Sequence, residues 1–488
     1  MYKFGVGVGV GGVDVAVTGG AGRHRYPARV PRTYWVETLG CPKNQVDSDK
    51  LTGTLVADGM VAATSAEEAD LVVVNTCAFV EDAREESVAT ILAFDERRAD
   101  GSKLVVTGCM AERYGDELAR ALPEVDAVTG FGVPVNLGRR DGGASGRALI
   151  PVTVLAGDGS AAGDQVADTA ARHDADSGGS EVPLLDLLNL PRPRSERPWA
   201  YVKVAEGCDK ACGFCAIPSF RGPQRSRSVE SVLAEVDSLG VREVVLIAQD
   251  LAAYGRDRTG DGRLVAAAAT TPIAELVRAV SDHAEWVRLL YLYPSELTDE
   301  LVEMIATGPV PYFDLSLQHV SAPLVRRMRR WGDGDRFLSR IESIRAFRPD
   351  AAFRSNFIVG YPGETEEDHD QLLEFVQAAQ LDWCGFFSYS NEEGTYAAGL
   401  DHHVDPALMA ERLGELSELQ DRITAQRRDA LVGERTSVLV DEPGVARSHR
   451  EAPEIDGIIE VPSDLPVGQI HLVEITAASG PDLTAVPV

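Results

Sequence analysis

The chain has few cysteines and no long apolar run. Only seven of its 488 residues are cysteine, which does not fit the dense disulfide frameworks of small secreted domains. No segment approaches the roughly eighteen consecutive apolar residues of a membrane-spanning helix. The composition is otherwise ordinary, with 44% hydrophobic and 25% charged residues. We therefore expect a cytoplasmic globular protein of several domains whose cysteines serve metal or redox chemistry.

Basic residues are also scarce. The sequence has 47 lysines and arginines against 76 aspartates and glutamates, a formal net charge of −29. Proteins bind nucleic acid phosphates through lysine and arginine, and a net acidic surface repels a polyanion. The charge thus disfavours nucleic acid as a partner and favours a basic protein, unless a basic patch gathers on one face.

Two segments have the composition of unfolded chain. Residues 1–32 are rich in glycine and valine and lack the charged start and apolar core of a signal peptide, so we expect a disordered or misassigned leader. Residues 137–196 are rich in glycine, alanine, aspartate and serine, which predicts a flexible linker or insertion. His173 within it is expected to be solvated. Folded domains are predicted at residues 33–136, 197–430 and 431–488.

The first predicted domain alternates strands and helices, which indicates a parallel α/β sheet. Its three clearest strands are Thr33–Gly40, Asp70–Thr76 and Lys103–Gly108. A cysteine directly follows each of them, namely Cys41, Cys77 and Cys109. Because the carboxyl ends of parallel strands lie on one edge of a sheet, we expect the three thiols to converge there. The alternative is that each is a small buried core residue.

The second domain contains six predicted strands, each followed by a helix, and a long helix near Pro406–Asp429 closes it. This pattern predicts a partly closed parallel barrel with its site at the carboxyl ends of the strands. The strands are Ala200–Gly207, Glu243–Asp250, Trp286–Tyr293, Tyr312–Gln318, Phe353–Gly360 and Trp383–Ser390. The third domain has short strands between turns, which predicts a small all-β barrel. It carries ten acidic and three basic residues, a net charge of −7.

The loop after the first barrel strand reads GCDKACGFCAIP and carries Cys208, Cys212 and Cys215. Three cysteines can hold a four-iron cluster and leave one iron without a protein ligand, as catalytic zinc sites leave one position open. That iron could chelate a small molecule through an amine and a carboxylate. A structural zinc site would need a fourth ligand, and the nearest histidines in the sequence, His173 and His283, are remote.

The stretch CDKACGFC resembles the radical S-adenosylmethionine enzymes, and the chain from about Thr33 to Val488 is similar to the methylthiotransferases. The resemblance implies a partial (β/α)6 radical S-adenosylmethionine barrel, a TRAM-like terminal domain and two four-iron four-sulfur clusters. One cluster, on Cys208, Cys212 and Cys215, would cleave S-adenosylmethionine to a deoxyadenosyl radical. The auxiliary cluster, on Cys41, Cys77 and Cys109, would offer sulfur, and a second S-adenosylmethionine would give the methyl group.

Four stretches resemble one branch of this family, the RimO-like enzymes, which modify the β-carbon of an aspartate in ribosomal protein S twelve. They are LGCPKNQVDSD, IAQDLAAYG, SNEEGTYAA and SHREAPEIDG. The net charge of −7 on the terminal domain agrees, because it suits a basic protein and disfavours tRNA. The alternatives are a MiaB-like enzyme acting on a tRNA adenosine and a non-catalytic iron–sulfur carrier. An electron donor such as flavodoxin or ferredoxin is implied, and a membrane partner is not.

The resemblance also implies a pocket for S-adenosylmethionine at the strand ends. Its expected members are Gln249, Asp250, Gln318, and Phe357 and Val359 of the stretch FIVGYPGE. Each of these has a plainer reading as a strand-end polar residue or part of a turn. Phe214 is expected to shield the cluster or simply to pack. We expect Cys384 to be a core residue, and the pair His402 and His403 to lie in a polar connection without a metal.

Overall fold

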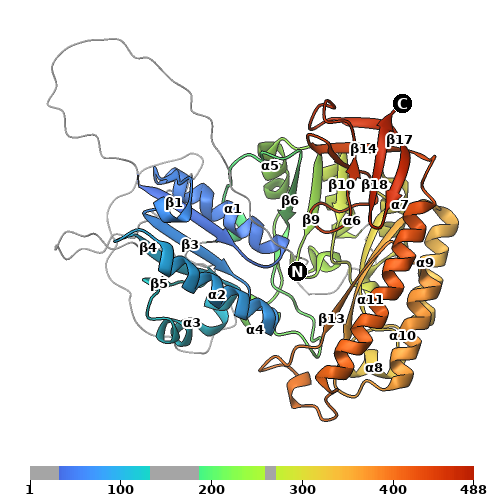
Figure 1. Cartoon of the computed structure of the whole chain (residues 1–488), viewed down its shortest axis with the longest axis horizontal. Helices are drawn as coiled ribbons and strands as arrows, with labels where there is room; N and C mark the ends of the chain where they lie inside the picture. Colours follow the sequence, from blue (N-terminus) through green and yellow to red (C-terminus); the bar gives the residue numbers. More distant parts are fainter. Residues whose placement is uncertain (1–31, 132–185, 259–270) are drawn as a thin grey trace.

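The computed structural model describes residues 32–131, 186–258 and 271–488. Almost all of the predicted leader and most of the predicted linker lie outside this part of the chain. In Figure 1 the N-terminal unit lies on the left in blue, and the strands of the C-terminal unit lie at the upper right in red. Among the described helices, none is long and apolar enough to cross a bilayer.

The N-terminal unit is a five-stranded parallel sheet, as predicted. Strands β1 (Thr33–Thr38), β3 (Leu71–Thr76) and β4 (Lys103–Gly108) form its centre, and the short β2 (Val61–Ala62) and β5 (Ala127–Val128) form its edges. The edge strands were not predicted, because two residues carry no alternation pattern. Helix α1 (Pro42–Ala57) packs on one face, and α2 (Glu81–Arg97) and α3 (Cys109–Ala121) pack on the other.

The central unit is an open arc of six parallel strands, which confirms the predicted partial barrel. One sheet has the order β10-β9-β6 and the other β11-β12-β13, and an isolated bridge between Leu292 and Leu315 joins them. The strand bounds are β6 (Trp199–Lys203), β9 (Glu243–Ile247), β10 (Trp286–Leu289), β11 (Tyr312–Gln318), β12 (Ala352–Val359) and β13 (Trp383–Ser388). Two short strands outside the arc, β7 (Ala205–Glu206) and β8 (Arg225–Ser226), pair antiparallel.

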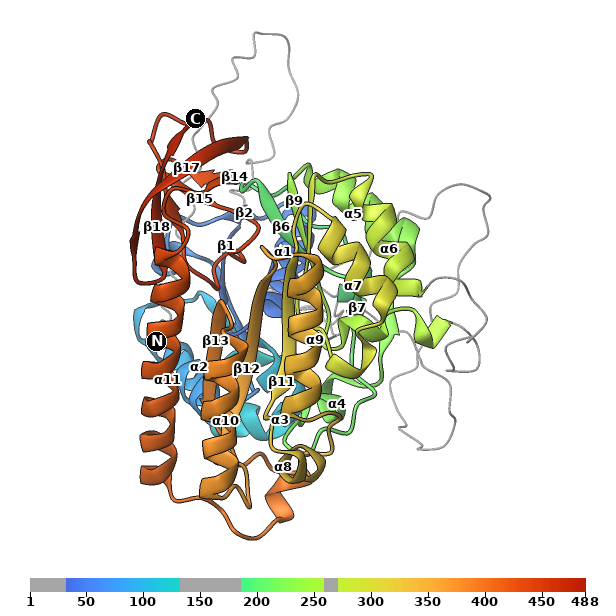
Figure 2. The ribbon, with the colours of Figure 1, turned by 90° about the vertical axis from the view of Figure 1, so that its right-hand side faces the viewer.

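Helices cover the outer side of this arc. They are α5 (Val229–Leu239), α6 (Pro272–Ser281), α7 (Asp299–Thr307), α9 (Gly334–Phe347), α10 (Glu366–Ala379) and α11 (Pro406–Asp429), with the short α4 (Ile217–Arg221) and α8 (Ala322–Arg327) near the strand ends. Figure 2 shows them around the strands, and Figure 1 shows α9 and α10 on the side opposite the N-terminal unit. The period of two explains this burial: on β6, Ala200 and Val202 face the helices while Tyr201 faces the interior.

The C-terminal unit is a closed five-stranded barrel, again as predicted. Its strands are β14 (Arg435–Glu442), β15 (Val445–Arg447), β16 (Ile459–Glu460), β17 (Ile470–Ser479) and β18 (Asp482–Pro487). Arg447 of this barrel forms a buried ion pair with Glu243 of the arc at 2.8 Å. Glu243 also pairs with Arg288 of β10 at 2.7 Å. Because Glu243 is the first residue of β9, this barrel covers the amino ends of the strands and leaves their carboxyl ends to the site.

Candidate cofactor and substrate site

The first cysteine triplet lies at the carboxyl edge of the N-terminal sheet. Cys41 caps α1, Cys77 follows β3 and Cys109 begins α3. The side-chain amide nitrogen of Asn44 donates to the carbonyls of Leu39 and Thr76, at 2.8 and 3.0 Å, and the Asn44 Oδ1 atom lies 3.5 Å from Cys109 Sγ. Asn44 therefore ties together the three loops that carry the cysteines, and the structure brings the triplet to one place as expected.

A close approach between two of these loops requires a glycine. Gly40 has a φ of +93°, and a Cβ atom there would lie 2.9 Å from Cys77 Sγ. Cys77 and Cys109 are buried and Cys41 is half-buried. Burial, followed by the neighbouring cysteines, raises the pKa of Cys77 to about 12. Thiolates at this place would need a positive counter-charge nearby.

The second triplet lies in the loop between β7 and α4. The Gly213 amide donates to the Met328 carbonyl at 2.8 Å, and its own carbonyl accepts from the Ala397 amide at 2.7 Å. Arg330 Nη1 donates to Cys212 Sγ at 3.2 Å, and the Lys210 amide donates to the sulfur of Cys208 at 3.4 Å. The loop is thus held from both sides, and its sulfurs already face hydrogen-bond donors.

The thiols of this second loop are also shielded from solvent. Burial raises the pKa of Cys208 to about 11 and that of Cys215 to about 12. In the described residues, no three Cys, His, Asp or Glu side chains converge on one metal ion. A four-iron cluster makes no such demand, because each thiolate binds a different iron.

A buried ionic network, which the sequence reading missed, connects the two triplets. Arg221 of α4 donates through Nη2 to Cys109 Sγ at 2.9 Å, and through Nη1 to Glu206 and Asp47 at 3.0 and 3.1 Å. Lys203 completes it by pairing with both carboxylates. Burial opposes the charge on Glu206, but Arg221 and Lys203 outweigh it and hold the pKa of Glu206 at about 2.

This network fixes α1 of the N-terminal unit against β6 of the arc. The only signal in the sequence was position: Asp47 lies in the LGCPKNQVDSD stretch, and Glu206 stands two residues before Cys208. Nothing in a sequence alone indicates that an arginine six residues past Cys215 reaches the other triplet.

Gln249 and Asp250 lie beside the loop that carries the second triplet. Gln249 Nε2 donates to Glu206 at 2.5 Å, and Asp250 lies 3.6 Å from the amine of Lys210. Within the described part of the chain, the buried Gln249 Oε1 and Asp250 Oδ1 atoms have no hydrogen-bond partner. Two buried hydrogen-bond acceptors without a donor thus lie next to the cysteine loop. Gln318 ends β11 with a left-handed φ of 72° and is half-buried.

Phe357 and Val359 do not join this group. Both side chains are fully buried on the helix-facing side of β12, where the Phe357 ring packs 6.1 Å from that of Phe375 in α10. The physical reason is the period of two along a strand, which turns the side chain of the residue between them, Ile358, to the opposite side. Ile358 and Phe214 both pack against a small apolar cluster there that includes Tyr361 and Tyr389. The motif therefore lies on β12, but the side chains of Phe357 and Val359 face the helices.

The remaining singled-out residues lie apart from the triplets. Cys384 is a free, half-buried thiol within β13, and burial raises its pKa. His402 and His403 are exposed in the connection before α11. His173 lies outside the described residues.

A second feature that the sequence reading missed is a loop after β13 that touches both triplet regions. Glu392, which is buried, accepts from Arg84 and Arg113 of the N-terminal unit, each at 2.6 Å. The same loop supplies the Ala397 amide that binds Gly213. The SNEEGTYAA stretch therefore connects the N-terminal sheet to the second cysteine loop.

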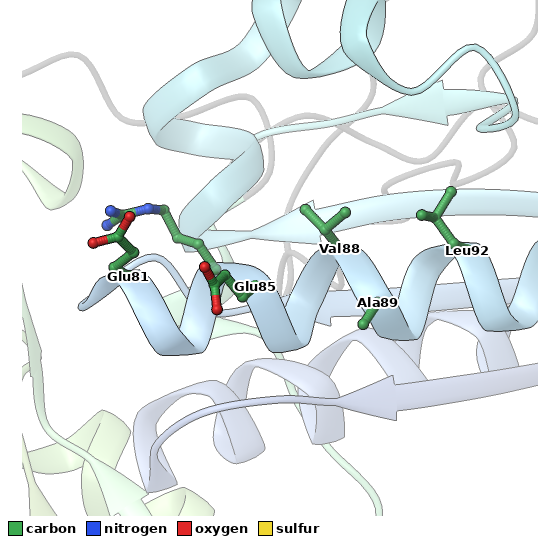
Figure 3. A pocket seen from close by; sticks show the side chains of 6 residues that line it. Glu81, Glu85, Val88, Ala89 and Leu92 are labelled. Carbon is green, nitrogen blue, oxygen red and sulfur yellow. The ribbon is translucent and has the colours of Figure 1, made fainter.

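Next to this connection, the outer face of α2 carries a shallow hollow of about 460 Å³ (Figure 3). Glutamates lie at its amino-terminal end and apolar side chains follow along the helix. Its lining residues are Glu81, Arg84, Glu85, Val88, Ala89 and Leu92. None of the predicted site residues lines it.

Known families match each folded unit. The uncharacterized protein family UPF0004 matches residues 33–130, the radical SAM superfamily matches residues 202–376, and the TRAM domain matches residues 432–488. Relatives called ribosomal protein uS12 methylthiotransferase RimO match nearly the whole chain. The protein of Koribacter versatilis is 40% identical over 94% of this chain and 97% of its own length. That of Streptomyces avermitilis is 42% identical over the same shares, and that of Cutibacterium acnes is 40% identical over 93% and 98%.

Proposed function

This chain belongs to the RimO family of radical S-adenosylmethionine enzymes that methylthiolate ribosomal protein uS12, and we propose that its two cysteine triplets hold the two clusters for this reaction. The auxiliary cluster would lie on Cys41, Cys77 and Cys109, and the radical cluster on Cys208, Cys212 and Cys215. The observation that carries the proposal is that one ionic network links Cys109 of the first triplet to Glu206, which stands two residues before Cys208 of the second. A carrier that only stores clusters has no need of such a joint.

The residues present suit these groups. Buried thiols stay protonated because a bare thiolate would not be solvated there. Metal binding removes the proton and compensates the negative charge of the thiolate. Arg221 already donates to a sulfur of the first triplet, and Arg330 donates to a sulfur of the second. The unpartnered acceptors Gln249 Oε1 and Asp250 Oδ1 suit the ammonium group of S-adenosylmethionine, a donor with three hydrogens.

When bound, the clusters would supply two things: the electron that cleaves S-adenosylmethionine to a carbon radical and methionine, and the sulfur atom that the product carries. The chain's own residues hold the geometry. Glu206 accepts from the side-chain nitrogen of Gln249, which leaves the oxygen of the same amide available to the ammonium group. Arg221 keeps the carboxyl edge of the N-terminal sheet against the arc, which would hold the two clusters in a fixed orientation.

The target in this proposal is the β-carbon of a uS12 aspartate, and the charge of the chain supports a basic protein substrate. A tRNA would meet a chain of net charge −29 with a terminal barrel that carries ten acidic and three basic residues. We further propose a cytoplasmic location and a one-electron donor protein such as flavodoxin or ferredoxin.

Anaerobically reconstituted protein, offered a uS12 loop peptide and tRNA in parallel, tests the proposal by mass spectrometry. We expect a methylthio mass gain on the peptide together with release of deoxyadenosine. A gain on tRNA alone would contradict the protein substrate, and absence of deoxyadenosine would reduce the chain to an iron–sulfur carrier.

A further inference from the structure

Lys43 differs from every other described lysine in having no anionic partner. Lys50, Lys103, Lys203 and Lys210 each pair with at least one carboxylate. The amine of Lys43 lies 3.4 Å from the ring centroid of Tyr291. No other described group lies within hydrogen-bond or ion-pair distance of that amine.

Lys43 lies where the N-terminal unit packs against the arc, at the contact that we call the joint between the two units. It lies in the first turn of α1, two residues after Cys41, while Tyr291 lies two residues past the end of β10. Both residues are half-buried. Tyr291 has a left-handed φ of 65°, uncommon for a residue with a side chain, and its amide is fixed by Asp314 at 2.9 Å. The ring under the amine is therefore held in place.

The carboxylates nearest to this joint are already engaged. Asp314 accepts from Arg354 at 3.1 Å as well as from the Tyr291 amide. Glu206 and Asp47 belong to the Arg221 and Lys203 network. Lys43 thus lies in partly desolvated surroundings, with the face of the Tyr291 ring on one side of its amine and no carboxylate partner among the described residues. An anion that enters from outside would satisfy it.

We propose that Lys43 binds the side-chain carboxylate of the target aspartate and thereby selects aspartate as the substrate residue. This inference rests on the proposed function, because it names the group that reads the substrate at the same site. The carboxylate is bonded directly to the β-carbon that reacts. An ion pair with Lys43 would therefore hold that carbon where the N-terminal unit meets the arc. An asparagine at the target position would offer only a neutral amide.

The test combines two changes in a double-mutant cycle. Reconstituted wild type and Lys43→Gln are each titrated with uS12 loop peptides that carry aspartate or asparagine at the target position, with binding followed by fluorescence anisotropy. Wild type should prefer the aspartate peptide by roughly thirty-fold or more, as expected when one partner of a partly buried charge pair is removed. Lys43→Gln should bind both peptides equally. Lys43→Arg should retain most of the preference, because it keeps the charge.

Lys103→Gln is the matched control, since Lys103 lies at the start of β4, 43% exposed and paired with Asp126. It should behave as wild type. Iron content and the thermal melt of every variant show whether the site is assembled. An unchanged aspartate preference in assembled Lys43→Gln overturns the inference, as does loss of iron in both Lys43 variants, which would make the residue structural. Wild type that neither binds nor modifies either peptide would instead refute the proposed function itself.

Discussion

Glu392 offers a direct way to loosen the contact between the two cysteine-bearing units. Its Oε2 atom accepts from Arg84 and Arg113, and its Oε1 atom accepts from Ser390 at 2.5 Å. The amide of Glu81, at the start of α2, donates to Ser390 at 3.2 Å. The substitution Glu392→Gln removes the charge that neutralises both arginines, while its volume stays the same.

The expected cost follows from burial. Breaking a buried ion pair costs about 3–5 kcal/mol when the remaining charge is left uncompensated. Arg113 is 8% exposed but Arg84 is 21% exposed, and a glutamine oxygen still accepts one hydrogen bond, so we expect about 2–3 kcal/mol. Since about 1.4 kcal/mol is a factor of ten, opening of this contact should become roughly thirty- to a hundredfold more frequent.

Hydrogen exchange read by mass spectrometry measures this opening. Peptides that contain the start of α2 and the loop after β13 should lose protection in Glu392→Gln, whereas peptides of the terminal barrel should not change. The neighbouring Glu393 is exposed and its side chain forms no hydrogen bond or ion pair in the described structure, so Glu393→Gln is the control. Equal exchange in the two variants would refute the view that Glu392 connects the units.

Two further changes test the second cysteine loop and the buried His319. A Cβ atom on Gly213 would lie 2.6 Å from the hydroxyl oxygen of Tyr361, so Gly213→Ala should displace the loop and lower iron content and deoxyadenosine release. Gly414→Ala, with open space around the position, should change neither. Burial lowers the pKa of His319 from 6.5 to about 4. As the pH falls, this histidine is therefore protonated in the unfolded chain before it is protonated in the folded protein. Unfolding free energy should therefore fall by up to about 3 kcal/mol as pH drops from 6.5 to 4. Urea titrations of His319→Gln should show a shallower loss, and an identical slope would contradict the assignment.

The layers of the molecule could be predicted because they depend on local pattern. The run LVVVNT of β3 is buried throughout, and an apolar run between helices is typical of a central parallel strand. The rule that parallel strands end on one edge was enough to predict that Cys41, Cys77 and Cys109 converge. The closed terminal barrel followed from its short strands and turns.

The joint between the units could not be predicted, because it depends on contacts between distant residues. Arg221 and Glu392 carry no pattern of their own, and their partners lie 112 and 308 residues away in the chain. The side of β12 on which the Phe357 side chain lies was predictable in principle. Arg354 and Asn356 are polar while Phe353 and Phe357 are apolar, and this alternation already places Phe357 toward the helices.

The central claim is that each triplet holds its own cluster. Iron and acid-labile sulfide, determined together with the Mössbauer spectrum after anaerobic reconstitution, test it in three proteins. These are wild type, a variant with Cys41, Cys77 and Cys109 changed to alanine, and a variant with Cys208, Cys212 and Cys215 changed to alanine. Wild type should bind twice the iron of either variant. Of the two variants, only the one that keeps Cys208, Cys212 and Cys215 should still release deoxyadenosine. Wild type with no more iron than one of the variants would contradict the account.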